Sequence, residues 1–488
     1  MRGARPVLFN IAAAAMPILT LPIIARLFPP AIYGSYAAFL AAATLICFLG
    51  TLRLDLAFVA ERQARYAGAL VALATTTILL AALMWTLVLP ALVPGWSAAP
   101  RAFGVSPAIA GPFVVMLGGM VFAQAALLRS GATWALATLN LTFHLVFFAT
   151  AVALSRIDAP LSGNGVLDGR VAAIVVALGI FLILGSRLGI RPRFPAPGDI
   201  LPALRRHADT IRFTYPYTIV GMLSADLILF ALILRGEAAM AGGYGLVRTV
   251  LLAAGSVFGA AVSPLYFRLA LVADATTVAA ATRRLALAVG PASFFAFGVA
   301  AGAARPLVDF AFGTNWAIAA DIVLLFAYPA AWTMLTGWPE RIFEARSHQA
   351  SGFLLHLFWG GAAGLAIGAT ILSGGHAWAM MSAYAAATLV FQVAYAVRAF
   401  ALAGLPMRWI AVLGLLATAA FGVGFALTAI AGRFLAAPAQ IAVAFALVAL
   451  AGLATARPLL TGLAAVNTGP AAGETGATAP TETHGAAS

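Results

Sequence analysis

The sequence contains very little charge for its length. Only 9% of its 488 residues are charged and 63% are apolar, whereas an ordinary soluble domain has about 25% charged residues. The mean hydropathy is +1.02. A membrane-spanning helix needs roughly 20 apolar residues, so this chain can supply about a dozen. The composition therefore excludes a string of soluble domains and predicts an all-α integral membrane protein.

Lysine is absent and cysteine is nearly so. All 28 basic residues are arginine, against 15 acids. Without lysine there is no Gly-x-x-x-x-Gly-Lys loop, which excludes ATP hydrolysis by that route. The six histidines form no His-Glu-x-x-His zinc pattern, and the single Cys47 cannot form an internal disulfide. We expect no metal and no cofactor.

Hydrophobic windows predict about fourteen spans. The first apolar stretch has no signal-peptidase site, so we interpret it as a span and not as a cleaved leader. The predicted spans lie near 7–27, 35–56, 66–90, 108–128, 133–155, 171–189, 211–234, 244–267, 285–303, 318–337, 353–373, 376–397, 410–431 and 434–456.

The arginines predict the orientation. With the N-terminus inside, 19 arginines fall in cytoplasmic segments, 7 in external segments, and Arg53 and Arg248 within spans. Basic residues concentrate on the cytoplasmic side of membrane proteins, so both termini should be cytoplasmic. The net charge of +13 then has a membrane explanation, and we expect no nucleic-acid partner.

The spans and loops predict the domain organisation. We expect an N-terminal six-helix lobe over residues 1–190, a basic cytoplasmic loop over 191–210 and a C-terminal six-helix lobe over 211–400, around a central cavity. Two additional spans occupy 401–457. Residues 458–488 are rich in Ala, Gly, Thr and Pro and should form a disordered cytoplasmic tail.

A short internal repeat favours two lobes. Both copies fall at an external helix–loop–helix junction, and repeats build the central site of many transporters. In the repeat, Arg26 precedes Gly34-Ser35-Tyr36, and Arg235 precedes Gly242-Gly243-Tyr244.

Ionisable residues within spans are functional candidates, because they are costly at bilayer depth. Arg53 and Asp55 lie near the inner end of the second span, where they either snorkel to the surface or face a cavity. Arg248 lies one turn inside the eighth span, and we interpret it as facing a cavity. Asp226 lies deep in the seventh span on the same face as Tyr215, and it either titrates, pairs with an arginine or joins two helices.

The fifth span has a polar stripe formed by Thr133, Asn140 and His144. Such a stripe often holds helices together, and the alternative is that His144 is a protonation site. His356 is interpreted as a core histidine. Arginine binds phosphate oxyanions through parallel hydrogen bonds, so the excess of arginine over acid within spans predicts an anionic lipid head group. A cation exporter would instead favour acids.

Several segments resemble bacterial oligosaccharide flippases, the Wzx-type branch of the multidrug/oligosaccharidyl-lipid/polysaccharide exporter superfamily. The resemblance covers roughly residues 5–456, and its motifs are moderately specific in combination. The matching segments are Leu19–Gly34, Thr51–Ala57 (where Leu54 and Asp55 replace the usual Tyr and Glu), Asp226 with the junction leading to Arg248, Phe312–Ala320, and Pro339–Ala345 followed by Gln349.

The resemblance implies a flippase in the bacterial inner membrane that acts by ion-coupled alternating access. Its substrate would be an undecaprenyl-diphosphate-linked oligosaccharide for O-antigen or exopolysaccharide synthesis, with a polymerase or glycosyltransferases as further partners. We expect Arg53, Arg248 and Arg26 to bind the diphosphate, Asp55, Asp226 or His144 to couple protons, and Asn140 and Tyr215 to line the cavity.

Two alternatives stay open. One is a small-molecule exporter of the same superfamily. The other is a membrane-embedded polymerase or ligase, which would be an enzyme. The external loops near 91–107 and 156–170 are too short for a catalytic domain, so movement of a substrate is favoured over its conversion.

Overall fold

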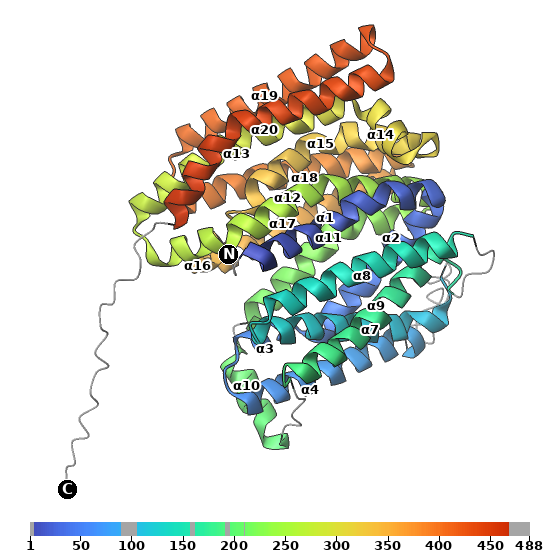
Figure 1. Ribbon diagram of the computed structural model, residues 1–488, viewed down its shortest axis with the longest axis vertical. Coiled ribbons are helices and arrows are strands. Elements are labelled where there is room, and N and C mark those ends of the chain that lie inside the picture. Colours follow the sequence, from blue (N-terminus) through green and yellow to red (C-terminus); the bar gives the residue numbers. More distant parts are fainter. Residues whose placement is uncertain (1–3, 89–104, 157–161, 191–195, 209, 468–488) are drawn as a thin grey trace.

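The computed structural model describes residues 4–88, 105–156, 162–190, 196–208 and 210–467, and this part of the chain is helical throughout apart from its turns. The helices lie side by side in an elongated bundle (Figure 1). Those of the first half are α1 (Ala4–Leu27), α2 (Pro30–Thr51), α3 (Leu54–Ala60), α4 (Ala64–Leu83, continued by a π-helical turn, Met84–Val88), α7 (Pro107–Arg129), α8 (Thr133–Leu154) and α9 (Gly165–Arg187).

The second half begins with a short helix, α10 (Ile200–Arg206), in the predicted basic loop. Its remaining helices are α11 (Tyr215–Leu234), α12 (Ala238–Val272), α13 (Ala275–Gly302), α14 (Ala304–Phe312), α15 (Ala317–Gly337), α16 (Ile342–Ala345), α17 (Gln349–Leu372), α18 (Ala377–Leu402), α19 (Met407–Phe434) and α20 (Ala437–Asn467).

The predicted membrane architecture is confirmed. Within the described residues, twelve helices are long and apolar enough to cross a membrane. The two remaining predicted spans coincide with α1 and α12, whose described apolar stretches are shorter, Met16–Leu27 and Ala238–Ala253. Two details differ. The second span is broken after Thr51, and α20 continues through Pro458 to Asn467, into the predicted disordered tail. Residues 191–195, 209 and 468–488 of the predicted loop and tail lie outside the described part.

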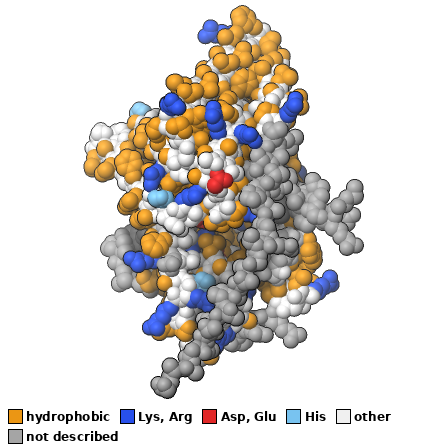
Figure 2. Space-filling model, turned by 90° about the vertical axis from the view of Figure 1, so that its left-hand side faces the viewer, with side chains coloured by type: hydrophobic (Ala, Val, Ile, Leu, Met, Phe, Trp, Pro, Cys, Tyr) orange, Lys and Arg blue, Asp and Glu red, His pale blue; other side chains and the backbone are white. Residues whose placement is uncertain are grey.

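Short turns alternate between two ends of the bundle. One end holds the turn between α2 and α4, the turn between α7 and α8, and α16; it is called the arginine-rich end here, and Figure 2 shows arginine side chains spread over it. The opposite end holds the α1–α2 and α11–α12 turns. Side-chain caps fix three helix starts. Asn164 accepts from the amides of Val166 and Leu167, Asp274 accepts from that of Thr277, and His376 accepts from that of Ala379.

The outer surface of the bundle is apolar and its helix contacts use small residues. Leu365, Leu415 and Leu453 are each more than 70% exposed, which suits lipid and not water as the surrounding solvent. The last two helices pack against α13. A Cβ atom at Gly298 of α13 would overlap the Phe421 carbonyl of α19, so this contact depends on close backbone approach, as membrane helices often do.

Candidate functional site

The two halves of the chain meet at the opposite end, through the two copies of the internal repeat. Helix α2 packs against α12, and Gly34 faces Gly242. A Cβ atom at Gly34 would overlap the Ala238 carbonyl oxygen, and one at Gly242 would overlap that of Pro30. No larger side chain fits at either position without separating the helices, so the glycines of the repeat allow this contact.

Further contacts tie the halves together at the same end. The Trp316 indole donates to the Ala25 carbonyl at 2.6 Å, and its ring packs edge-on against Tyr33. Arg26 Nε donates to the Ala311 carbonyl at 3.2 Å, and Arg26 also donates to Phe310. These carbonyls end α14, where a positive charge is favourable. The structure therefore places Arg26 on a helix terminus.

Arg53 lies at a break in the second predicted span. Leu52 and Arg53 have φ values of 50° and 57°, in the left-handed region that costs a residue with a Cβ atom roughly 1–2 kcal/mol. Arg53 Nε is 3.9 Å from Asp55 Oδ1, and both atoms are buried without a hydrogen-bond partner. The guanidinium also lies over the Phe48 ring. Such strain is a reason to infer a functional role.

Arg248 pairs with Asp226 beside an aromatic pocket within the second half. The pair joins α12 to α11; the Arg248 side chain is 31% exposed and that of Asp226 only 9%. The neighbouring cavity has a volume of about 260 Å³. It is lined by Arg248, by rings from four helices and by several polar groups, among them Tyr244, Phe326, Trp359, Tyr384, His356, Thr333, Thr388 and Gln392.

The three predicted diphosphate ligands lie at different depths. Helices α2 and α12 run in the same direction from the Gly34–Gly242 contact. At 1.5 Å per residue, Arg53 lies about 28 Å beyond Gly34 and Arg248 about 9 Å beyond Gly242. Arg26 lies at the opposite end itself. The structure therefore does not bring these arginines around one diphosphate.

The remaining predicted site residues have separate surroundings. Asn140 accepts from Gln124 at 2.8 Å and so joins α8 to α7. The His144 ring packs edge-on against Phe143. Tyr215 starts α11 and is half-buried. None of these three is among the residues lining the described pocket.

Arg170 was not predicted as a site residue, because it was assigned to an external loop. It lies in the second turn of α9. Its guanidinium donates to the Tyr36 hydroxyl at 3.0 Å and lies over the Phe143 ring, while its Nε is buried without a partner. The sequence signal was its position directly before the apolar run that starts at Val171, because a helix that began a few residues earlier would have included it.

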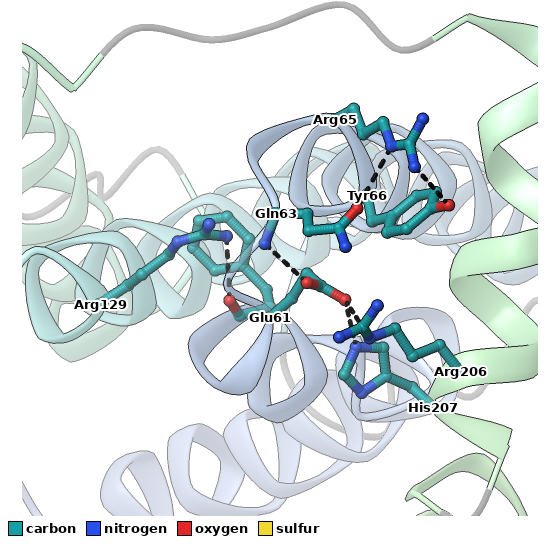
Figure 3. Close-up of polar contacts among 8 residues, drawn as sticks. Glu61, Gln63, Arg65, Tyr66, Arg129, Arg206 and His207 are labelled. Atoms are coloured by element: carbon teal, nitrogen blue, oxygen red, sulfur yellow. Dashed lines mark hydrogen bonds and ion pairs between the residues drawn. The ribbon is translucent and has the colours of Figure 1, made fainter. Parts of the chain in front are cut away.

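The linker between the halves is tied to the first half by one glutamate. Glu61, which ends α3, has a fully buried side chain and contacts His207 Nε2 at 3.0 Å and Arg206 Nε at 3.3 Å. It also accepts from the Gln63 amide at 2.7 Å (Figure 3). Burial raises the pKa of Glu61, but the Gln63 amide, His207 and Arg206 outweigh it and hold that pKa below its ordinary value.

Comparison with known proteins identifies the fold. No family model matches the sequence, and no curated protein matches it. Among solved structures, the chain is similar to the lipid II flippase MurJ in an inward closed conformation, with a TM-score of 0.66 over 93% of this chain and 100% of that one. This chain has the MurJ fold. At 13% identity the likeness shows the architecture alone and does not extend to the activity or the substrate.

Proposed function

We propose that this protein moves a polyprenyl-diphosphate-linked oligosaccharide from the cytoplasmic to the outer leaflet of the bacterial inner membrane. The arginine-rich end would face the cytoplasm, in accord with the distribution of basic residues in membrane proteins. The observation that carries the proposal is Arg53, held beside a strained helix break with an unused Nε, in a chain with the fold of a lipid-linked flippase.

The depths of the arginines favour successive contacts with the diphosphate. Arg53 would meet it near the cytoplasmic end, and Arg248 would meet it nearer the opposite end, while the lipid tail stays in the bilayer. An arginine with free donors binds a diphosphate by charge-assisted hydrogen bonds. Arg26 is already engaged with α14, so we assign it to the contact between the halves and not to the substrate.

The contacts between the halves support alternating access. Glycine packing, Trp316 and Arg26 close the opposite end in this structure. Release of the glycan on the outer side requires these contacts to separate. The O-antigen or exopolysaccharide pathway and any polymerase or glycosyltransferase partner remain predictions.

The small-molecule exporter is less well supported. Such a protein needs an acid free to bind an organic cation, but Asp226 is paired with Arg248 and Asp55 lies 3.9 Å from Arg53. A change in resistance to cationic drugs on deletion, with lipid-linked glycans unaffected, would favour the exporter.

The test of the proposal is reconstitution into vesicles with a labelled polyprenyl-diphosphate oligosaccharide, whose sidedness is read by a reagent that cannot cross the membrane. We expect Arg53→Ala to abolish movement of the lipid. The matched control is Arg62→Ala, because Arg62 is exposed on the same end of the bundle. Near-normal movement by a folded, inserted Arg53→Ala protein would refute the assigned role of Arg53.

A further inference from the structure

Three polar side chains from three segments form a hydrogen-bonded chain in the second half. Glu340, which follows α15, is exposed at the arginine-rich end. Tyr217 of α11 donates its hydroxyl hydrogen to Glu340 Oε1 at 2.6 Å. The Tyr217 hydroxyl oxygen is in turn 3.1 Å from His356 Nε2 on α17.

The hydrogen bonds give this chain a direction. A tyrosine hydroxyl has one hydrogen, and that of Tyr217 is directed at Glu340. His356 Nε2 must therefore carry the hydrogen of the second bond, which leaves Nδ1 as the unprotonated nitrogen of a neutral ring. His356 Nδ1 is buried and has no hydrogen-bond partner among the described residues. One end of the chain is thus an exposed carboxylate, and the other is an unused acceptor.

The unused acceptor lies on the pocket side of the imidazole. A Cβ atom at Gly221 would be 3.4 Å from His356 Nδ1, and Gly221 is one helical turn beyond Tyr217 on α11. Gly221 and His356 both line the cavity that holds Arg248. The chain therefore runs from the arginine-rich end to this cavity.

Aromatic rings enclose the imidazole. Phe391 and Tyr395 of α18 lie at 4.9 and 5.8 Å between ring centroids, and Trp359 of α17 lies at 6.1 Å. These rings pack around the imidazole, and its Nε2 contacts the Tyr217 hydroxyl, so a proton that leaves the ring through Nε2 passes to Tyr217.

The charged groups near the chain lie at its two ends. Arg341 and Glu344 flank Glu340, and in the pocket Arg248 is paired with Asp226. The Tyr395 hydroxyl, 3.4 Å from that of Tyr217, is a side branch.

We propose that His356, Tyr217 and Glu340 form a proton relay that carries a proton from the Arg248 pocket to the arginine-rich end and couples this movement to transport. A proton from pocket water binds Nδ1, the Nε2 hydrogen passes to the Tyr217 oxygen, and the Tyr217 hydrogen passes to Glu340. Glu340 then releases it to water, so one proton enters and one leaves. The relay is reset when the imidazole turns so that its N–H again faces the Tyr217 oxygen and its unprotonated nitrogen faces the pocket, and the Tyr217 hydroxyl turns back to Glu340.

The direction of the relay suits a protein that moves a lipid-linked glycan outward. The coupling of the relay to transport therefore rests on the proposed function. With the arginine-rich end in the cytoplasm, protons would move inward while the glycan moves outward. The relay differs from the predicted use of Asp55, Asp226 or His144, because Asp226 is paired with Arg248 and the other two lie outside the pocket.

The experiment uses the full chain in vesicles that enclose a pH-sensitive dye, with the labelled polyprenyl-diphosphate oligosaccharide and an imposed proton gradient. Proton uptake and lipid movement are measured together. Tyr217→Phe removes only the hydroxyl that joins Glu340 to His356. The matched control is Tyr266→Phe, whose buried hydroxyl bonds Thr282 at 2.9 Å outside the relay.

We expect Tyr217→Phe to abolish gradient-driven proton uptake and the acceleration of lipid movement by the gradient, while Tyr266→Phe retains both. Equal uptake by the two variants would overturn the relay. If the wild-type protein moves lipid but takes up no protons, the relay is wrong and the flippase stands. If it takes up protons through Tyr217 but moves no lipid, the relay stands and the proposed function is wrong. If it does neither, both are wrong.

Discussion

A disulfide across the contact between the halves should stop transport reversibly. A Cβ atom built at Gly245 of α12 lies 3.0 Å from the Ala37 Cβ of α2, and a disulfide holds the two Cβ atoms about 3.5–4.5 Å apart. The pair Ala37→Cys and Gly245→Cys therefore needs a separation of only about 0.8 Å to reach the mean disulfide value of about 3.8 Å. Any opening that takes these atoms beyond about 4.5 Å is then blocked.

The assay compares oxidised and reduced protein in the vesicle system, on a background in which Cys47→Ala removes the native thiol. Disulfide formation is read by loss of maleimide labelling. The matched control is Ala151→Cys with Gly169→Cys, which joins α8 to α9 inside the first half, where the corresponding Cβ distance is 3.3 Å.

We expect oxidation to abolish lipid movement in the pair that joins the halves and a reductant to restore it, with no change in the control pair. Equal transport by the oxidised and reduced forms of the first pair would refute the argument that this end opens during the cycle.

Three further predictions concern the charged contacts. Arg26→Ala should lower thermal stability by about 0.3–1 kcal/mol, the usual effect of a charge at a helix terminus, without weakening lipid binding; weaker binding measured by titration would instead place Arg26 on the diphosphate. Arg248→Ala leaves Asp226 buried and unpaired, which costs about 3–5 kcal/mol. In the double variant with Asp226→Asn, we expect the unfolding temperature to return most of the way to that of the wild type while transport stays lost. Recovery of transport in this variant would show that Arg248 has only a structural role. The pKa of Glu61 is lower when folded than when unfolded, so its contribution to stability is present above the unfolded pKa and is lost as pH falls through the folded one. Glu61→Gln should remove this acid-dependent loss from thermal unfolding curves, and an unchanged pH profile would contradict the assignment.

Hydropathy predicted the spans because apolar length is a local property of the sequence. The break after Thr51 was not predicted. Helix breaks are usually indicated by Gly or Pro, and the two residues at this break are Leu52 and Arg53. The repeat identified the two glycine junctions, but not that they contact one another. Only the tertiary structure shows that.

The candidate site was predictable only in part, for the same reason. Helical spacing places residues of one helix on one face, as for Asp226 and Tyr215, but it does not show which helices pack together. The Arg248–Asp226 pair matches one of the predicted alternatives for Asp226. In the chain from Glu340 through Tyr217 to His356, Tyr217 lies more than a hundred residues before the other two, so His356 alone looked like an ordinary core residue.

The most direct test of the central claim is the sidedness of the diphosphate-linked glycan in cells depleted of this protein. The flippase account predicts that complete repeat units accumulate on the inner leaflet while polymer is lost, and mass measurement of those units would identify the sugar. Complete units that reach the outer leaflet but stay unpolymerised would contradict the account and favour a polymerase. Unchanged glycan lipids would contradict it in favour of a small-molecule exporter.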